Sequence, residues 1–319
     1  MGVLMLEPVF KEAIWGGKLL QNFGYEEAGD KAGECWGISA HSSGDCTIKN
    51  GEYKGKTLSW CYQNHRELFG NMKEEVFPLL VKIIGAEDDL SIQVHPDDQY
   101  AAVNENGALG KTECWYILDC KEDATIVIGH HAKDKQELEE MIREKRWKEL
   151  IREIPIQKGD FFQINPGCLH AIKGGTLLIE TQQSSDVTYR VYDYDRMQNG
   201  KPRELHIQQS IDCITAPHQD YQEERVIRHK QGLTVERLVK CPFYTLEKWE
   251  MDGTYHFQME RPFVNVTVIE GQGNVGDIPL KKGDHFIIPS TEKECDFQGE
   301  MTLMVSYCCL LYTSDAADD

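Results

Sequence analysis

The sequence lacks an apolar run near the roughly 20 residues that a membrane-spanning helix needs, so we expect no membrane association. It also lacks an amino-terminal basic segment followed by a long apolar core, which argues against a secretory signal. Basic residues are scarce: 34 Lys and Arg stand against 53 Asp and Glu, and the formal net charge is −19. Nucleic acids need a basic surface, so this charge argues against DNA or RNA as partners. An anionic substrate would have to be held by a few local cations.

Paired cysteine spacings are missing as well. The 11 cysteines include no Cys-x-x-Cys pair, which leaves both a zinc ribbon and a thioredoxin-type motif unsupported. Cysteines without paired spacings in a chain without an export signal are typical of reduced thiols. We therefore predict a cytoplasmic protein.

The final stretch, Cys309–Asp319, fits no pattern found elsewhere in the chain. It resembles the translation of a sequencing adapter joined to the end of a reading frame. We hypothesise that it is not natural protein, and we exclude it from fold prediction. A genomic codon run that encodes these residues would contradict this hypothesis.

The 319 residues suggest about two domains, and most of the chain has strand-like patterning. A polar run over 218–232 suggests a linker, so we expect a first domain over 1–226 and a second, purely β domain over 227–308. Helical periodicity is confined to a few segments of the first domain. These segments are one or two helices within 57–84, an amphipathic helix over 133–153, and a short helix near 203–216.

An internal repeat relates the two predicted domains. Pro155–Pro166 (PIQKGDFFQINP) closely parallels Pro279–Pro289 (PLKKGDHFIIP), with a slip of one residue. The first copy is followed four residues later by His170, whereas Lys293 stands at that place after the second copy. The sequence therefore indicates two related β units, of which only the first could hold a metal.

Three strand-like segments of the first domain carry metal-ligating side chains. Gln93 and His95 are two residues apart, so both side chains should lie on one face of a strand. Glu113 opens a second strand-like run, and His170 follows a Pro-Gly turn. Two imidazoles, a carboxylate and an amide oxygen suit a divalent metal. Taken singly, each could be a structural histidine or a surface charge, but the set favours metal.

Several motifs in the same order resemble the short bacterial class of type I mannose-6-phosphate isomerases, a family of the cupin superfamily of small β-barrels. The resemblance extends from about Pro8 to Tyr307 and rests on the segments Ile14–Gly17 (IWGG), Gly33–Trp36 (GECW), Gln93–Asp97 (QVHPD), Gly110–Tyr116 (GKTECWY), Pro166–Ala171 (PGCLHA) and Ser185–Asp195 (SDVTYRVYDYD). It implies a mostly β protein of two cupin-like jelly-roll barrels, with a few helices on the first. It further implies one Zn²⁺ held by His95, Glu113 and His170, with Gln93 as a weaker fourth ligand.

The resemblance also implies an aldose–ketose isomerase that interconverts mannose 6-phosphate and fructose 6-phosphate through a cis-enediol. Negative charge then develops on oxygen, which calls for a Lewis acid or cation and an acid/base group. The catalytic candidates are Arg190, Lys111 and, as an alternative base, Asp186, whose other role would be to orient Arg190. Trp15 and Glu34 are candidates for the sugar pocket, although an aromatic residue in a small β domain is usually core.

Two alternatives share the ligand set. A non-catalytic sugar-binding cupin could keep the metal as a structural ion, and two histidines with one carboxylate also suit the iron of an oxygenase. The flanking residues favour zinc and the isomerase. The sequence leaves open which group takes the proton, which residues bind phosphate, which related sugar is used, and the oligomeric state, with a monomer as one possibility.

Overall fold

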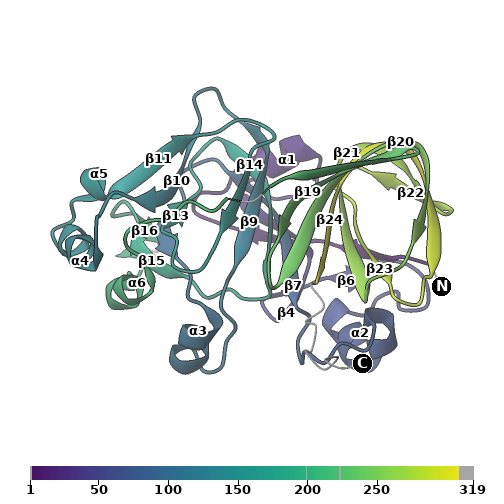
Figure 1. Ribbon diagram of the computed structural model, residues 1–319, viewed down its shortest axis with the longest axis horizontal. Helices are drawn as coiled ribbons and strands as arrows, with labels where there is room; N and C mark the ends of the chain where they lie inside the picture. The colour runs from purple at the N-terminus through teal and green to yellow at the C-terminus, as the bar shows by residue number, and fades with distance from the viewer. Residues whose placement is uncertain (1, 199, 223, 309–319) are drawn as a thin grey trace, which may run out of the picture.

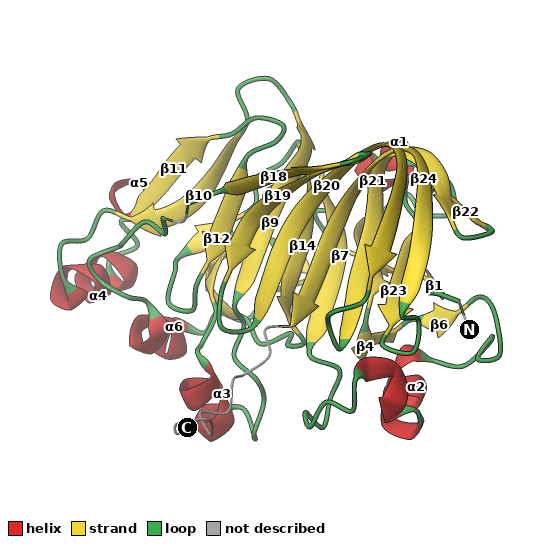
Figure 2. Ribbon diagram, turned by 45° about the vertical axis from the view of Figure 1, so that its right-hand side comes forward, coloured by secondary structure: helices red, strands yellow, loops and turns green. Residues whose placement is uncertain are grey.

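The computed structural model describes residues 2–198, 200–222 and 224–308, so the tail hypothesis for Cys309–Asp319 lies outside the described residues. Strands dominate and form two β units side by side, with the helices gathered at their ends (Figures 1 and 2). None of the described helices is both long and apolar enough to cross a membrane. The predicted mostly β class is confirmed.

The N-terminal unit consists of two antiparallel sheets. The larger has the order β12-β9-β14-β7-β3-β2 and the smaller the order β11-β10-β13-β8-β15. The strands of the larger sheet are β2 (Val9–Glu12), β3 (Ala32–Ile38), β7 (Leu79–Ala86), β9 (Glu113–Cys120), β12 (Phe161–Ile164) and β14 (Thr176–Gln183). Those of the smaller sheet are β8 (Ile92–Val94), β10 (Thr125–His130), β11 (Ile151–Pro155), β13 (His170–Ala171) and β15 (Tyr189–Tyr192).

The C-terminal unit is one curled sheet of order β18-β19-β20-β24-β21-β23-β1-β6, with β22 paired to β21. Its strands are β1 (Leu4–Glu7), β6 (Thr47–Ile48), β18 (Val226–Lys230), β19 (Leu233–Lys240), β20 (Tyr244–Gln258), β21 (Phe263–Val275), β22 (Ile278–Lys281), β23 (His285–Pro289) and β24 (Glu294–Cys308). Two strands from the start of the chain thus belong to it, through Met5 opposite Phe286. The domain division at 226/227 stays a prediction.

Helices and short hairpins lie around the two units. They are α1 (Leu19–Phe23), α2 (Leu58–Asn64), the 3₁₀ turn η1 (Arg66–Phe69), α3 (Asp98–Asn104), α4 (Lys135–Arg143), α5 (Trp147–Leu150), α6 (Ile207–Cys213), and the pairs β4 (Ala40–His41) with β5 (Gly44–Asp45) and β16 (Met197–Gln198) with β17 (Lys201–Pro202). The short helix expected near 203–216 is therefore present as α6.

Three sequence-based expectations need correction. The helix expected over 133–153 is interrupted, because Lys145 has a positive φ of 57° and the chain then enters strand β11. Helical periodicity within 57–84 ends earlier than expected, since Leu79–Ala86 is strand β7. The polar linker expected over 218–232 contains strand β18, whose side chains are mostly exposed, so its composition resembled that of a loop.

Strand β7 shows how the site is positioned. All eight of its residues are buried, because Val81 and Ile83 pack into the core between the units while Ile84 and Ala86 pack into the interior of the N-terminal unit. Lys82 has the same parity as Ile84 and therefore points into that interior. Strands buried on both faces do not alternate in polarity. A charge within such a strand must find a buried partner.

Candidate metal centre

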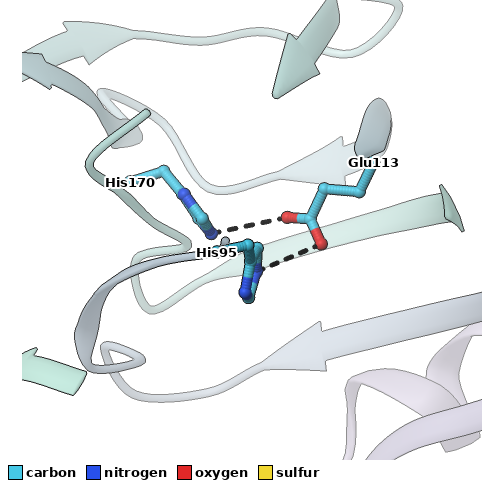
Figure 3. Close-up of side chains that lie close together, drawn as sticks. All are labelled: His95, Glu113 and His170. Atoms are coloured by element: carbon cyan, nitrogen blue, oxygen red, sulfur yellow. Dashed lines mark ion pairs between the residues drawn. The ribbon is translucent and has the colours of Figure 1, made fainter. Parts of the chain in front are cut away.

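The predicted metal ligands converge inside the N-terminal unit from three strands that are distant in sequence (Figure 3). His95 directly follows β8, Glu113 begins β9, and His170 begins β13. In the smaller sheet His170 is paired directly with Gln93, so these two side chains lie on the same face. The Pro-Gly turn before His170 requires glycine: Gly167 has φ of 84°, and a Cβ there would meet Thr215 Oγ1 at 2.5 Å.

The three side chains are close enough to share one ion. His95 Nε2 lies 3.4 Å from Glu113 Oε2, and His170 Nε2 lies 3.4 Å from Glu113 Oε1. One ligand atom from each residue falls within 4.8 Å of the others. All three residues are almost completely buried, at 1%, 0% and 0% exposure. Gln93 joins them, with its Nε2 placed 3.3 Å from His170 Nε2.

Backbone carbonyls fix both imidazole rings. His95 Nδ1 lies 2.9 Å from the carbonyl oxygen of Val187, and His170 Nδ1 lies 2.9 Å from that of Cys168. A carbonyl can only accept, so each Nδ1 carries the proton and each Nε2 presents its lone pair to the centre. Metal-bound histidines are oriented by this kind of contact.

The protonation states also suit a metal. Burial, followed by the charge of Lys111, lowers the pKa of His95 to about 4, and burial lowers the pKa of His170. Burial alone would raise the pKa of Glu113, but Lys111 and His95 outweigh it and hold that pKa well below its ordinary value. Near neutral pH the centre therefore holds neutral imidazoles and a carboxylate, the forms that bind metal.

The donor set passes a direct test of fit. Glu113 Oε1 is buried and has no hydrogen-bond partner, which is the state of a carboxylate oxygen that lacks a ligand. Lys111 Nζ lies against Glu113 Oε2 and 3.2 Å from His95 Nε2, so a cation already occupies one side of this group. Two nitrogens and a carboxylate are the usual protein ligands of a catalytic zinc ion.

A line of alternating buried charges leads away from the centre across the larger sheet. Lys111 Nζ lies 3.7 Å from Glu180 Oε1, which is 3.4 Å from Lys82 Nζ, which in turn is 3.5 Å from Glu34 Oε2. Sequence reasoning missed Lys82 and Glu180. Each interrupts an apolar strand, as in LLVKII and TLLIET, and that interruption was the available signal.

Indole groups hold the carboxylates of this line. Trp115 Nε1 donates to Glu180 Oε2 at 2.8 Å, and Trp36 Nε1 donates to Glu34 Oε2 at 2.6 Å. Burial acts to raise the pKa of Glu34, but Lys82 and this hydrogen bond lower it overall. The two indole groups therefore fix the orientation of both carboxylates toward the same interior.

Arg190 is also placed beside the centre. It lies opposite Gln93 in the pairing of β15 with β8, so it shares the face of Gln93 and His170. Its Nη1 donates to the carbonyl of Glu204 at 2.8 Å, whereas its Nε is buried without a partner. Burial, and then the nearby charge of Arg203, lower its pKa.

The remaining predicted site residues lie in different surroundings. Asp186 is on a loop with its side chain 56% exposed; it accepts from Ser43 Oγ at 3.3 Å and lies 3.8 Å from His41 Nε2. The Arg190 guanidinium contacts Glu204, not Asp186. Trp15 is 6% exposed and packs into the apolar core of the N-terminal unit. The Glu34 side chain is 23% exposed and faces the site interior.

Comparisons with known proteins cover nearly the whole chain. Residues 3–117 match the model of the phosphomannose isomerase type I catalytic domain. Residues 234–308 match the model of the mannose-6-phosphate isomerase cupin domain. Both units of the structure are thus represented by one family of proteins.

Individual relatives agree with these family models. Mannose-6-phosphate isomerase ManA of Bacillus subtilis is 46% identical over 311 residues, which cover 95% of this chain and 98% of that protein. Mannose-6-phosphate isomerase of Streptococcus mutans is 46% identical over 314 residues, covering 95% and 99%. A crystal structure of the mannose 6-phosphate isomerase from B. subtilis superimposes with a TM-score of 0.94 at 47% identity, over 96% of this chain and 100% of that one.

Proposed function

The chain belongs to the type I mannose-6-phosphate isomerase family, and from this premise we propose that it interconverts mannose 6-phosphate and fructose 6-phosphate with one zinc ion per chain. The observation that carries the proposal is the buried group of His95, Glu113 and His170, whose ligand atoms lie within 4.8 Å of one another. A chain with these relatives and this donor set is equipped for sugar isomerisation at a metal. The cupin-type fold supports the same reading.

We assign the metal to His95, Glu113 and His170, with Gln93 as the fourth ligand. These residues would hold an ion whose Lewis acidity would polarise the substrate oxygens. The chain's own contribution is orientation: the carbonyls of Val187 and Cys168 fix the two rings. Gln93 on β8 and His95 just after it are two residues apart, so both side chains lie on one face of the strand.

We propose that the isomerisation proceeds by proton transfer between C1 and C2 through a cis-enediol. Negative charge then builds on the substrate oxygens, where cationic donors stabilise it. The Arg190 Nε donor is buried without a partner, so it is proposed to stabilise this charge or the phosphate. Lys111 Nζ, which contacts Glu113 in the structure, is the second cation proposed for this role. Arginine suits either anion because its donors form a planar fork.

The proton-transfer group is proposed among residues of the same site. Lys111 lies within the centre, whereas the exposed carboxylate of Asp186 would need the loop that carries it to approach the substrate. Glu34 is proposed to contact the sugar hydroxyls, and Trp15 to support that wall from the core. Exchange of the substrate C2 proton with deuterium from the solvent distinguishes the two candidate bases. We compare Lys111→Met with Asp186→Asn, and exchange should be abolished in the variant that lacks the essential base.

We also propose that the protein acts in the cytoplasm. In the described part of the chain, the thiols of Cys35, Cys46, Cys61, Cys114, Cys120, Cys168, Cys213 and Cys295 form no disulfide, as expected for a reducing compartment. The proposed site residues all come from the N-terminal unit of a single chain, so a monomer would be competent. These assignments of location and assembly are independent of the chemistry.

The experiment that tests the function is metal analysis of the purified protein together with an isomerase assay. We expect about one zinc per chain, conversion of mannose 6-phosphate to fructose 6-phosphate, loss of activity on chelation and recovery with zinc. Mannose and related phosphosugars should be assayed in parallel. Sugar binding without conversion would favour the non-catalytic cupin, and activity that survives complete metal removal would refute the metal assignment.

A further inference from the structure

Corresponding strands of the two β units pair in the same order and register, so residues of one unit can be matched to residues of the other. In the N-terminal unit Ile164 of β12 is paired with Glu113 of β9. In the C-terminal unit Ile288 of β23 is paired with Val264 of β21. The sequence repeat aligns Ile164 with Ile288. Val264 therefore occupies the position that Glu113 has at the metal centre.

The correspondence continues across the neighbouring strands. The order β12-β9-β14-β7-β3 in one unit matches β23-β21-β24-β20-β19 in the other. Glu180 is paired with Trp115 and with Lys82, whereas Val305 is paired with Val266 and with Glu247. Because Trp115 and Val266 each lie two residues after a matched position, Val305 stands where Glu180 does. Glu247 then stands where Lys82 does.

A cavity of about 440 Å³ occupies this place in the C-terminal unit. All three matched positions, Glu247, Val264 and Val305, contribute to its lining. The volume falls in the range of small-molecule sites, about 300–1,000 Å³. The C-terminal unit has therefore lost the metal ligands but kept a hollow at the position of the active site.

The inner wall of the cavity combines aromatic rings with a buried carboxylate. Glu247 is 7% exposed and accepts hydrogen bonds from Trp249 Nε1 at 2.8 Å and from the Tyr307 hydroxyl at 3.1 Å. A carboxylate offers about four acceptor positions, so Glu247 can still accept from ligand hydroxyl groups. The two aromatic partners hold it in one orientation.

The rim of the cavity gathers positive charge. Arg228, Lys230 and Arg261 are exposed there, together with His256 and Glu260. Lys230 Nζ donates to the Tyr255 hydroxyl at 2.9 Å, and the Arg261 guanidinium lies over the Tyr307 ring, 4.7 Å from its centre. In a chain of net charge −19, three cations around one cavity are a local exception suited to an anion.

We propose that the C-terminal unit contains a second ligand site, which binds a small anion bearing hydroxyl groups, the class to which the sugar phosphates belong. Arg228 and Arg261 bind the anionic group at the rim, and Glu247 accepts from hydroxyl groups inside. The site lies outside the metal centre and includes none of the ligands assigned to that centre.

Fluorine NMR of protein labelled with fluorotryptophan tests this inference on the full-length zinc-loaded chain. The chain has six tryptophans, and Trp249 lines the cavity, so its resonance is assigned with Trp249→Phe. Trp115 lies near the metal centre, with its ring 5.4 Å from that of His170, and reports binding there. The probes are fructose 6-phosphate, fructose and inorganic phosphate.

Fructose 6-phosphate should shift the Trp249 resonance saturably, and fructose and phosphate should each do so more weakly. Loss of one charge-assisted contact should weaken this response about tenfold in Arg228→Ala and Arg261→Ala. The matched control is Arg143→Ala, which removes the same charge from an exposed position on α4 and should leave the midpoint unchanged. All three variants should keep the Trp115 response and the basal activity.

A Trp249 resonance that stays fixed overturns the second site, whether or not Trp115 responds. Equal midpoints in the wild type, Arg228→Ala and Arg261→Ala also overturn it. A missing Trp115 response, in contrast, bears on the proposed metal centre and leaves the second site standing. The two proposals therefore fail separately.

Discussion

The N-terminal and C-terminal units place different side chains at the same three strand positions. Lys82, Glu113 and Glu180 in the first correspond in register to Glu247, Val264 and Val305 in the second. Buried charges cost several kcal/mol each unless they are paired, whereas a buried valine stabilises the fold. The first unit thus carries charged side chains at all three positions, whereas the second carries one, Glu247, beside two valines.

The contrast also explains why the N-terminal unit carries a line of charges and not a single one. Glu113 alone would be an anion deep inside a β sandwich. Lys111 compensates it, Glu180 compensates Lys111, and Lys82 lies between Glu180 and Glu34, which is partly exposed. The alternating charges therefore extend from the metal centre to Glu34, whose carboxylate is partly solvated.

The largest effect is expected when the metal position is changed. Glu113→Gln keeps the shape but removes the anionic ligand, so metal content should fall and activity should drop by more than about 100-fold, since even outer-shell changes cost 10–100-fold. Metal analysis and the isomerase assay measure both. The register-matched control is Val264→Ala, which should keep metal and activity while losing about 2 kcal/mol of unfolding free energy. Retained zinc in Glu113→Gln would contradict the ligand assignment.

The next largest effect on activity is expected from changes at Arg190. In the proposed mechanism Arg190→Ala removes a donor that stabilises the substrate anion, so kcat/KM should fall by about 10²–10³-fold with zinc still bound. Arg190→Lys should restore only part of this loss, because an ammonium group lacks the planar fork. Steady-state kinetics with zinc analysis provide the measurement. Unchanged kcat/KM would remove Arg190 from the site.

Changes at Lys82 and at its counterpart Glu247 compare how much a buried charge contributes to the stability of each unit. Lys82→Met leaves Glu34 and Glu180 without their shared cation, so unfolding free energy should fall by about 3–5 kcal/mol. Glu247→Gln should cost less, since an amide oxygen can still accept from Trp249. Urea unfolding of both variants measures the difference. Equal losses would show that the charge line has no special role in the N-terminal unit.

Strand periodicity and donor chemistry made much of this site readable in the sequence. Gln93 and His95 share a face because they are two residues apart, and His170 follows a turn that needs Gly167. Helical periodicity in the sequence predicted a helix correctly where one face is exposed, as in α6. It failed at Leu79–Val81, since a strand buried on both faces has no alternation.

Contacts between distant segments could not be read from the sequence. The pairing of β1 with β23 joins the start of the chain to its last unit, and no local pattern specifies it. Lys82 and Glu180 carry buried charges that become meaningful only when β7 and β14 are adjacent. The interior of the second unit was likewise hidden, because the sequence shows the lost histidine but not the cavity.

The smallest expected effect concerns His285, which stands in the C-terminal unit where the repeat has Phe161 in the other. It is fully buried against the Tyr25 hydroxyl at 2.7 Å and Thr267 Oγ1 at 2.9 Å. Burial, and then the charge of Lys49, lower its pKa to about 3. An unfolded histidine has a pKa near 6.5, so below that pH the unfolded chain binds a proton that the native protein does not.

Stability from this group is therefore fully present above about pH 6.5 and declines as the pH falls toward 3, by about 1.4 kcal/mol per pH unit. The proposed metal ligands also titrate, so the informative quantity is the difference between wild type and His285→Gln. Urea unfolding between pH 7 and pH 4.5 should give a shallower decline in His285→Gln, while the exposed His229→Gln should follow the wild type. Parallel profiles for His285→Gln and wild type would mean that the imidazole binds its proton over the same pH range in the native and unfolded protein, and that this position, like Phe161 in the N-terminal unit, adds no pH dependence.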